Sequence, residues 1–205
     1  DDGLAPAKVT SLKADTYTVT ARIQESGNSA QTNTRFIPDS STATITASNL
    51  TINPNGALAD GADIDAVEAI VTDANGNLVP NASVNFVVAT GAMITTVIGT
   101  TGADGKATAT VTSTTAGKYK VTATVSGRSA SKDAVFVADN GTATIIAGNL
   151  KVTADNALAN GTATNAVQAK VTDANGNVVP NVAVSFSANN GATVTMASAL
   201  TNESG

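Results

Sequence analysis

The chain of 205 residues has no cysteine, no histidine and no tryptophan. Without cysteine it cannot form a disulfide, a thiol nucleophile or a thiolate metal site. Without histidine it lacks the most frequent catalytic base and an imidazole metal ligand. The sequence therefore predicts a protein that is not an enzyme, with no catalytic, cofactor-binding or metal-binding residues and no cofactor.

Charge is scarce as well: 13% of the residues are charged and the net charge is −5. Nucleic-acid-binding domains cluster lysine and arginine against phosphates, and no such cluster is present, so nucleic acid is excluded as a partner. A polybasic segment for an anionic membrane surface is missing too. No apolar run approaches the ~20 residues of a membrane helix, and no signal peptide is present. The chain starts in mid-pattern at Asp1, which predicts a fragment of a longer protein.

Small and β-branched residues dominate what remains. Aromatic residues are only 3% of the chain, whereas hydrophobic residues are 42% and alternate clearly with polar ones. Alternation at period two is typical of half-buried β-strands. This hydrophobic content argues against disorder, and no helical period competes.

The chain repeats itself. Residues 71–81 return as residues 171–181 with one difference, and residues 40–105 align without a gap on residues 140–205 with nearly half of the positions identical. A period of about 100 residues indicates whole domains in tandem. Residues 1–39 match the end of the unit instead, because Tyr17 aligns with Tyr119. We therefore predict the C-terminal strands of a first domain in 1–39, a complete domain in 40–139 and the N-terminal strands of a third in 140–205.

Seven strands are expected in the complete unit, which predicts an all-β chain of tandem Ig-like β-sandwiches arranged in a rod. Tyr119 precedes Val121 by two residues, the spacing that an Ig domain uses for a tyrosine corner before its second cysteine. Val121 then takes the cysteine position. The expected strands are a first, split strand at 42–47 and 50–52, followed by 65–72, 83–88, 92–98, 106–112, 118–125 and 128–137, the last with an ambiguous buried face.

Three motifs carry a resemblance to a known family. They are Val-Thr-Asp-Ala-Asn-Gly-Asn at 71–77 and 171–177, Gly-Lys-Ala-Thr-Ala-Thr-Val-Thr-Ser at 105–113, and Val-Phe-Val-Ala-Asp at 135–139. The chain resembles bacterial Ig-like domains of group 1 (Big-1) of the intimin/invasin family of inverse autotransporter adhesins. Residues 1–39 depart most from the pattern, since Pro6 stands where Thr108 stands inside an expected strand and would remove a ladder donor.

The resemblance implies a structural role. In that family such domains form a stalk that projects a distal receptor-binding domain from the outer membrane, so we expect the extracellular part of a cell-surface protein that meets the host cell surface through its parent and contacts neighbouring Ig-like domains. Short connections such as residues 138–141, with no Gly/Ser-rich linker, favour a stiff rod. The alternative left open is that the domains themselves bind a host protein, glycan or matrix component.

Residues 73–77 have two interpretations. Their alternating carboxylate and amide oxygens are similar to a calcium loop, but the EF-hand glycine and bidentate glutamate are missing. Asn-Gly is a strong turn signal, because both residues accept positive φ, and a turn is the preferred interpretation. Asp60, Asp63 and Asp65 could bind a cation with Asp73, whereas a solvated acidic loop is the default, since their counterparts are Asn160, Ala163 and Asn165.

The remaining candidate side chains are explained by packing or exposure. Lys170 and Ser185 could be imagined as a hydrolytic pair, but Ile70 replaces Lys170 in the other copy and an exposed strand is the simpler interpretation. No aromatic residue is left for a sugar platform, because core packing accounts for every repeat-equivalent pair, namely Phe36/Phe136, Phe86/Phe186 and Tyr17/Tyr119.

The two partial domains suggest an assembly. Gly3, Gly105 and Gly205 are equivalent in the repeat, and a unit without its last two strands exposes an apolar face and unpaired edges. The complete unit separates the two ends of one chain. We therefore expect head-to-tail strand complementation between chains in a non-closing assembly. The alternative is that the missing parts existed as a separate, cleaved piece.

Overall fold

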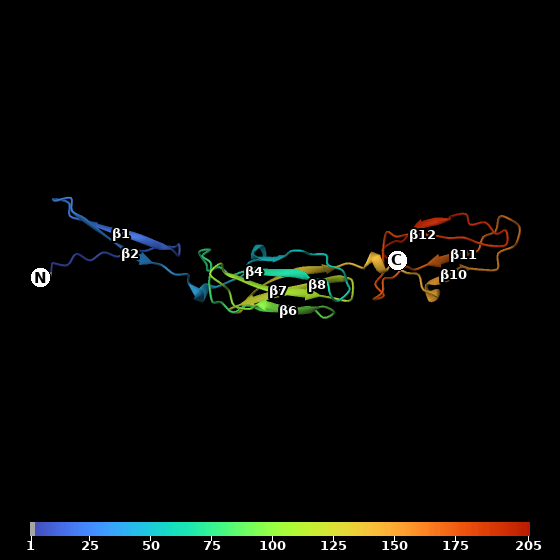
Figure 1. Ribbon diagram of the computed structural model, residues 1–205, viewed down its shortest axis with the longest axis horizontal. Helices are drawn as coiled ribbons and strands as arrows, with labels where there is room; N and C mark the ends of the chain where they lie inside the picture. Colours follow the sequence, from blue (N-terminus) through green and yellow to red (C-terminus); the bar gives the residue numbers. More distant parts are fainter. Residues whose placement is uncertain (1–2) are drawn as a thin grey trace.

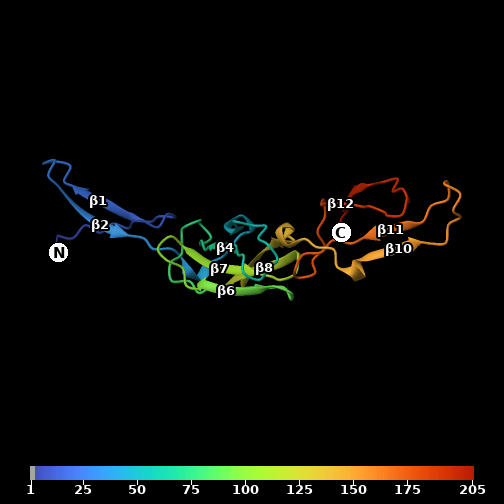
Figure 2. The ribbon, with the colours of Figure 1, turned by 45° about the vertical axis from the view of Figure 1, so that its right-hand side comes forward.

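The computed structural model describes residues 3–205 as an elongated chain of β-structure (Figure 1). Three parts follow one another along the long axis: the N-terminal segment (3–39), the central unit (40–139) and the C-terminal segment (140–205). The elongated shape persists when the view is turned (Figure 2). Helical structure among the described residues is limited to short 3-10 turns, so the predicted all-β, tandem Ig-like fold in a rod is confirmed.

Two antiparallel sheets form the central unit. One has the order β3-β4-β7-β6 and the other the order β5-β8-β9. This is the seven-strand sandwich that the alternation predicts. The strands are β3 (Leu50–Ile52), β4 (Asp65–Ile70), β5 (Asn85–Val88), β6 (Met93–Ile98), β7 (Lys106–Thr112), β8 (Gly117–Val125) and β9 (Arg128–Phe136).

The core of the sandwich comes from alternate positions on facing strands. β4 and β7 pair with Val67 opposite Ala109, and both side chains are buried. Tyr119 and Phe136 meet edge to face with ring centroids 6.0 Å apart, and Phe86 is buried with them. Packing of these three aromatic residues in the core is confirmed, and burial of large apolar side chains at about 1.5–3 kcal/mol each stabilises the unit.

Three details of the strands differ from the prediction or complete it. The prediction of a strand at 42–47 is wrong for most of its length. These residues form only an isolated bridge at Thr44, which lies between the 3-10 turns η1 (Ser40–Thr42) and η2 (Ala47–Asn49). Strand β5 begins two residues later than expected, after an isolated bridge between Ser83 and Thr100. The ambiguous last strand buries Phe136 and leaves Val137 exposed.

The flanking segments carry smaller sheets. The N-terminal segment pairs β1 (Thr16–Arg22) with β2 (Ser29–Arg35), and no strand includes Pro6. In the C-terminal segment the 3-10 turns η3 and η4 repeat η1 and η2, at Asn140–Thr142 and Ala147–Asn149. Its strands form two pairs, β10 (Leu150–Ala154) with β11 (Ala166–Ala169) and β12 (Ala183–Ser185) with β13 (Ser198–Leu200).

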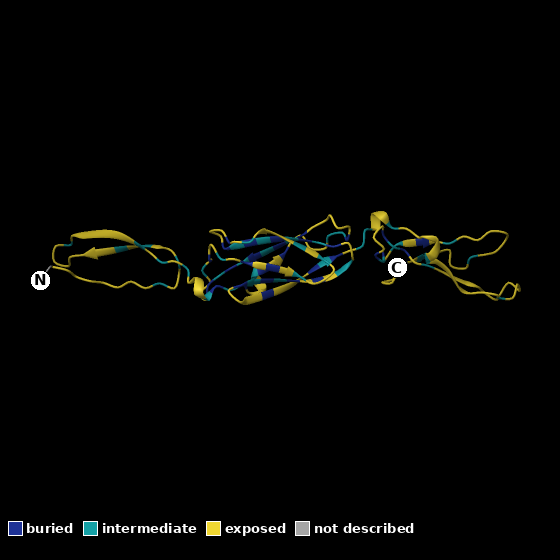
Figure 3. Cartoon of the chain, turned by 90° about the horizontal axis from the view of Figure 1, so that it is seen from below, coloured by how far each residue is buried: buried dark blue, intermediate teal, exposed yellow. Residues whose placement is uncertain are grey.

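Burial is concentrated in the central unit (Figure 3). Leu50 and Val67 are 0% and 1% exposed, whereas their equivalents Leu150 and Val167 are 54% and 53% exposed. The C-terminal segment therefore exposes some of the apolar positions that the central unit buries, whereas Val171, Val179 and Val184 stay buried in both copies. No helix in residues 3–205 is long and apolar enough to cross a membrane.

Candidate functional site: the joint between units

The repeated stretch at 71–81 forms a tight turn. Asp73 O accepts a hydrogen bond from Gly76 N at 3.0 Å, and Thr72 bridges Leu78 across the turn. Gly76 has φ +84°, whereas Asn75 is not among the residues with positive φ. The predicted turn is confirmed, and of the Asn75-Gly76 pair only the glycine is left-handed. The second copy repeats it, with a hydrogen bond of 3.0 Å from Gly176 N to Asp173 O.

The Asp73 carboxylate organises this turn from a buried position. Its Oδ1 accepts from the backbone N of Asn75 and of Asn77, both at 2.9 Å. Its Oδ2 accepts from Asn77 Nδ2 at 2.8 Å and from Asp39 N at 3.0 Å. Burial would raise the pKa of Asp73, but these four donors outweigh it and hold the pKa below its usual value. The pKa of Asp173 is lowered in the same way by four equivalent donors.

The same turn fixes the segment that enters the unit. Asp39 caps the turn η1, with Oδ1 accepting from Ser41 N at 3.0 Å. Thr42 Oγ1 accepts from Ala74 N at 3.1 Å, and backbone bonds join Thr44 to Thr72. The connection is therefore pinned to the turn along its length. Asp139 and Thr142 repeat the arrangement in the second copy.

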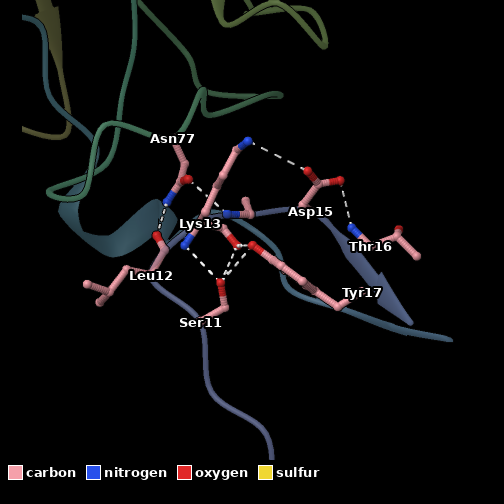
Figure 4. A network of polar contacts seen from close by, with 8 residues as sticks. Ser11, Leu12, Lys13, Asp15, Thr16, Tyr17 and Asn77 are labelled. Atoms are coloured by element: carbon pink, nitrogen blue, oxygen red, sulfur yellow. Dashed lines mark hydrogen bonds and ion pairs between the residues drawn. The ribbon is translucent and has the colours of Figure 1, made fainter. Parts of the chain in front are cut away.

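Asn77 reaches from this turn into the N-terminal segment (Figure 4). Its Nδ2 donates to Leu12 O at 2.9 Å, and its Oδ1 accepts from Ala14 N at 2.8 Å. One amide thus satisfies a donor and an acceptor of the neighbouring backbone. Because Asp73 also accepts from the same Nδ2, the amide orientation is fixed from both sides.

Asn177 repeats this contact between the central unit and the C-terminal segment. Its Nδ2 donates to Thr114 O at 3.0 Å, and its Oδ1 accepts from Ala116 N at 2.8 Å. Thr114 and Ala116 are the repeat equivalents of Leu12 and Ala14, each 102 residues further on. The two joints therefore use the same atoms at equivalent positions. We call each set, Asp73 with Asn77 and Asp173 with Asn177, a joint clasp.

The second joint has one further contact. Asn175 Nδ2 donates to Ala59 O at 3.0 Å, and Asn177 Nδ2 lies 3.4 Å from the same oxygen. Ala59 is buried, so the segment after the joint supplies the side-chain donors to this carbonyl. Asn75, the equivalent of Asn175, makes no side-chain hydrogen bond within residues 3–205.

The tyrosine corner presents the backbone that each clasp binds. Tyr119 Oη donates to Thr115 O at 2.8 Å, and Ser113 Oγ donates to the same oxygen at 2.9 Å. Tyr17 Oη likewise donates to Lys13 O at 3.1 Å, as drawn in Figure 4. The geometry expected of a tyrosine corner is present in both places. The tyrosine holds Thr115, which lies between the two residues whose backbone Asn177 contacts, and Tyr17 holds Lys13 in the same way for Asn77.

Comparison with known proteins identifies the domain type. The sequence pattern of the family described as bacterial Ig-like domain (group 1) matches residues 47–137 and 147–205. The chain belongs to this family. This Big-1 chain is 35% identical over 196 residues to inverse autotransporter adhesin YeeJ of Escherichia coli (strain K12). The match covers 90% of the chain and 8% of YeeJ, so the chain spans a small part of that relative's length.

Solved structures support the fold of the Big-1 chain. Invasin, a bacterial integrin-binding protein, superposes with a TM-score of 0.52 at 22% identity, covering 93% of this chain and 40% of invasin. InvD of Yersinia pseudotuberculosis gives a TM-score of 0.52 at 16% identity, covering 82% of this chain and 52% of InvD. At these identities the likeness establishes the fold alone.

The acidic residues of the Big-1 unit do not converge as the cation hypothesis requires. Asp65 begins strand β4, and Asp73 lies three residues beyond its other end, so an extended strand of about 3.3 Å per residue separates the two carboxylates too far to share one ion. Asp60 Oδ1 accepts from the backbone N of Ala62 and Asp63, which lowers the pKa of Asp60. Asp65 Oδ1 accepts from two backbone N–H groups of the loop before β4. No three acidic side chains within residues 3–205 gather as metal ligands would.

The pair Lys170 and Ser185 is not brought together either. Both residues are exposed, and no hydrogen bond joins their side chains in the described part of the chain. The sequence alone did not indicate the joint clasp. The signal that could have found it was Asn77, because a tight turn explains the Asn-Gly pair but not the second asparagine, which both copies retain.

Proposed function

We propose that this Big-1 chain is a segment of the extracellular stalk of a bacterial surface adhesin. Its domains are proposed as 1–39, 40–139 and 140–205, the first and last being parts of Ig-like units. Each unit acts as a spacer, and each joint clasp restricts bending between neighbours. The stalk would project a distal receptor-binding domain from the outer membrane toward the host cell surface.

The repetition of the clasp carries this proposal. Asn77 and Asn177 each bind one carbonyl and one N–H of the preceding part of the chain, at distances between 2.8 and 3.0 Å. A hydrogen bond of this kind contributes about 0.5–1.5 kcal/mol net. Several such bonds, together with a pinned connection, favour one relative orientation of neighbours over a broad range. A stiff spacer needs such a preference at every joint.

The family match and the similarity to YeeJ support the proposed place of the chain in a surface adhesin. The matched family is named for an Ig-like domain and the curated relative for an adhesin, which supports a non-enzymatic role in adhesion and a location at the cell surface. The joint binds backbone atoms, so its contacts do not depend on the side chains at residues 12 and 14 or 114 and 116. This suits a stalk in which many units of differing sequence follow one another.

A binding assay on the isolated 205-residue chain separates a spacer from a binding module. The fluorescently labelled chain is added to cultured host cells at concentrations where light scattering shows a monomer. The spacer account predicts only weak, non-saturating association. Saturable binding that unlabelled chain displaces would contradict it and favour the alternative, in which the Ig-like domains contact a host component directly.

Head-to-tail complementation is proposed for the isolated chain. The C-terminal segment exposes Leu150, Val152 and Val167, and β1 with β2 is the kind of hairpin that covers the equivalent face in the central unit. We expect light scattering to show species larger than one chain as concentration rises. A variant with Tyr17 and Val19 both changed to Ser should dissociate, whereas a monomer at all concentrations would refute the idea.

A further inference from the structure

We propose that Asn175 is a deamidation site whose reaction releases the joint between the central unit and the C-terminal segment. The inference rests on the proposed stalk function, since it names a way in which one stiff joint becomes loose. The site is the amide of Asn175 followed by Gly176, and the co-reactant is water. The products are aspartate or isoaspartate at position 175 and ammonia.

The chemistry follows from the Asn-Gly sequence. The backbone N of Gly176 loses its proton and attacks Cγ of Asn175. The bond from Cγ to Nδ2 breaks, and Nδ2 takes up a proton and leaves as ammonia, so that a five-membered succinimide remains. Water then opens either carbonyl of this ring to give aspartate or isoaspartate. Glycine offers the least steric hindrance to the attack because it has no Cβ. A Cβ at Gly176 would meet nothing within 4 Å, and Asn175 is exposed, so water can reach the amide. The hydrogen bond from Gly176 N to Asp173 O must open before the attack, and the first copy has the same bond from Gly76 N to Asp73 O.

The product is incompatible with the joint. Asn175 Nδ2 donates to Ala59 O at 3.0 Å. An aspartate at this position has no donor and places a carboxylate oxygen against a carbonyl oxygen. Ala59 is fully buried, so its carbonyl would keep only the longer contact of 3.4 Å from Asn177 Nδ2. A buried acceptor that loses its donor is destabilised.

Isoaspartate would act on the clasp as well. It adds one atom to the main chain inside the turn, between the N–H groups of residues 175 and 177 that bind the Asp173 carboxylate. After this insertion the two N–H groups cannot both keep their distances of 2.8–2.9 Å to Asp173 Oδ1. Either product therefore weakens the contact between the central unit and the segment that follows.

Asn75 is a matched control within the same chain. Residues 71–77 and 171–177 are identical, and both turns have the same hydrogen bonds to the aspartate. Asn-Gly also occurs at residues 55, 140, 160 and 190. Within residues 3–205, Asn175 is the only one of these asparagines whose side chain donates to a neighbouring unit. Its hydrogen bond must break before Cγ can turn toward Gly176 N, so a closed joint slows the reaction that opens it.

Peptide mass spectrometry on the full chain in mildly alkaline buffer tests the proposal. We expect Asn75 to deamidate about five-fold faster than Asn175 in the folded chain, the factor that corresponds to about 1 kcal/mol. In concentrated urea the two rates should become equal. Asn177→Ala, which opens the joint, should bring the rate at Asn175 close to that at Asn75. Equal rates in the folded wild-type chain would overturn the proposal.

The consequence is tested with Asn175→Asp and its control Asn75→Asp. Spin labels on the two sides of the second joint report the spread of distances by electron paramagnetic resonance. Asn175→Asp should broaden the distribution, and Asn75→Asp should leave it unchanged. If the two variants give the same distance distribution, the inference is overturned. The stalk proposal then still stands, provided that the wild-type distribution is narrow. A broad wild-type distribution instead contradicts the stalk proposal itself.

Discussion

Asp73 and Asp173 are buried carboxylates that each collect four N–H donors in the joint clasp. A short acidic side chain can gather so many donors because the turn points the N–H groups of residues 75 and 77, and of 175 and 177, toward it. The tight turn was predictable from Asn-Gly. The contacts of Asp73 with Asp39 and of Asn77 with Leu12 were not predictable. Both partners come from the preceding part of the chain, and their proximity depends on how neighbouring parts pack.

The pH dependence of stability follows from these two carboxylates. Their pKa values are lowered in the folded chain, so each stabilises the fold fully above its unfolded pKa, about 3.9. This stabilisation is lost as pH falls through the lowered folded value. We predict that the urea concentration at the midpoint of unfolding of the central unit decreases as the pH is lowered below about 4. Asp73→Asn should be less stable at neutral pH and show a flatter decline, whereas a decline as steep as that of the wild type would contradict this account.

Asp65 offers a second test at the residue scale. It is fully buried, its Oδ1 accepts from Gly56 N and Ala57 N, and its Oδ2 has no hydrogen-bond partner within residues 3–205. Asp65→Asn keeps an acceptor for both N–H groups and removes the charge, as Asn165 does for Ala157 N. We expect its free energy of unfolding to stay within about 1 kcal/mol of the wild type, and Asp65→Ala to lose about 2 kcal/mol. Chemical denaturation measures both, and equal losses would refute the assigned role of Oδ1.

At the scale of elements, alternation predicted nearly all strands of the central unit, since a sandwich strand needs only one buried face. It failed at residues 42–47, where the chain is held by Asp39, Thr42 and the turn rather than by a continuous ladder. Loop residues that bind a turn carry no period. The equivalence of Tyr17 and Tyr119 predicted the tyrosine corner, but its closeness to the clasp followed only from the three-dimensional arrangement.

Two glycines test the packing of the turn against its neighbouring loop. Gly105 has φ +68°, and a Cβ there would lie 2.8 Å from Val71 O. Gly127 has φ +76°, and a Cβ there would meet nothing within 4 Å. Gly127→Ala should lose about 1–2 kcal/mol for the left-handed conformation alone. Gly105→Ala should lose at least about twice as much by thermal or chemical unfolding, and equal losses would show that the close approach to Val71 is not maintained.

At the scale of the whole molecule, the chain is a row of similar units whose contacts are mainly with neighbours. In such arrays stability is approximately a sum of unit terms and interface terms. The joint clasp is the interface term here, and two copies of it use equivalent atoms. Sequence periodicity predicted the row of domains, whereas the stiffness that we propose for it depends on the contacts at the joints.

The stiffness of the second joint can be measured directly by distance distributions between two spin labels. The chain has no cysteine, so Lys132→Cys and Lys151→Cys place one label on each side of the joint at exposed residues. A second pair within the central unit checks that the fold is intact. The account predicts a single narrow distribution that Asn177→Ala broadens. A wild-type distribution as broad as that of the variant would contradict it.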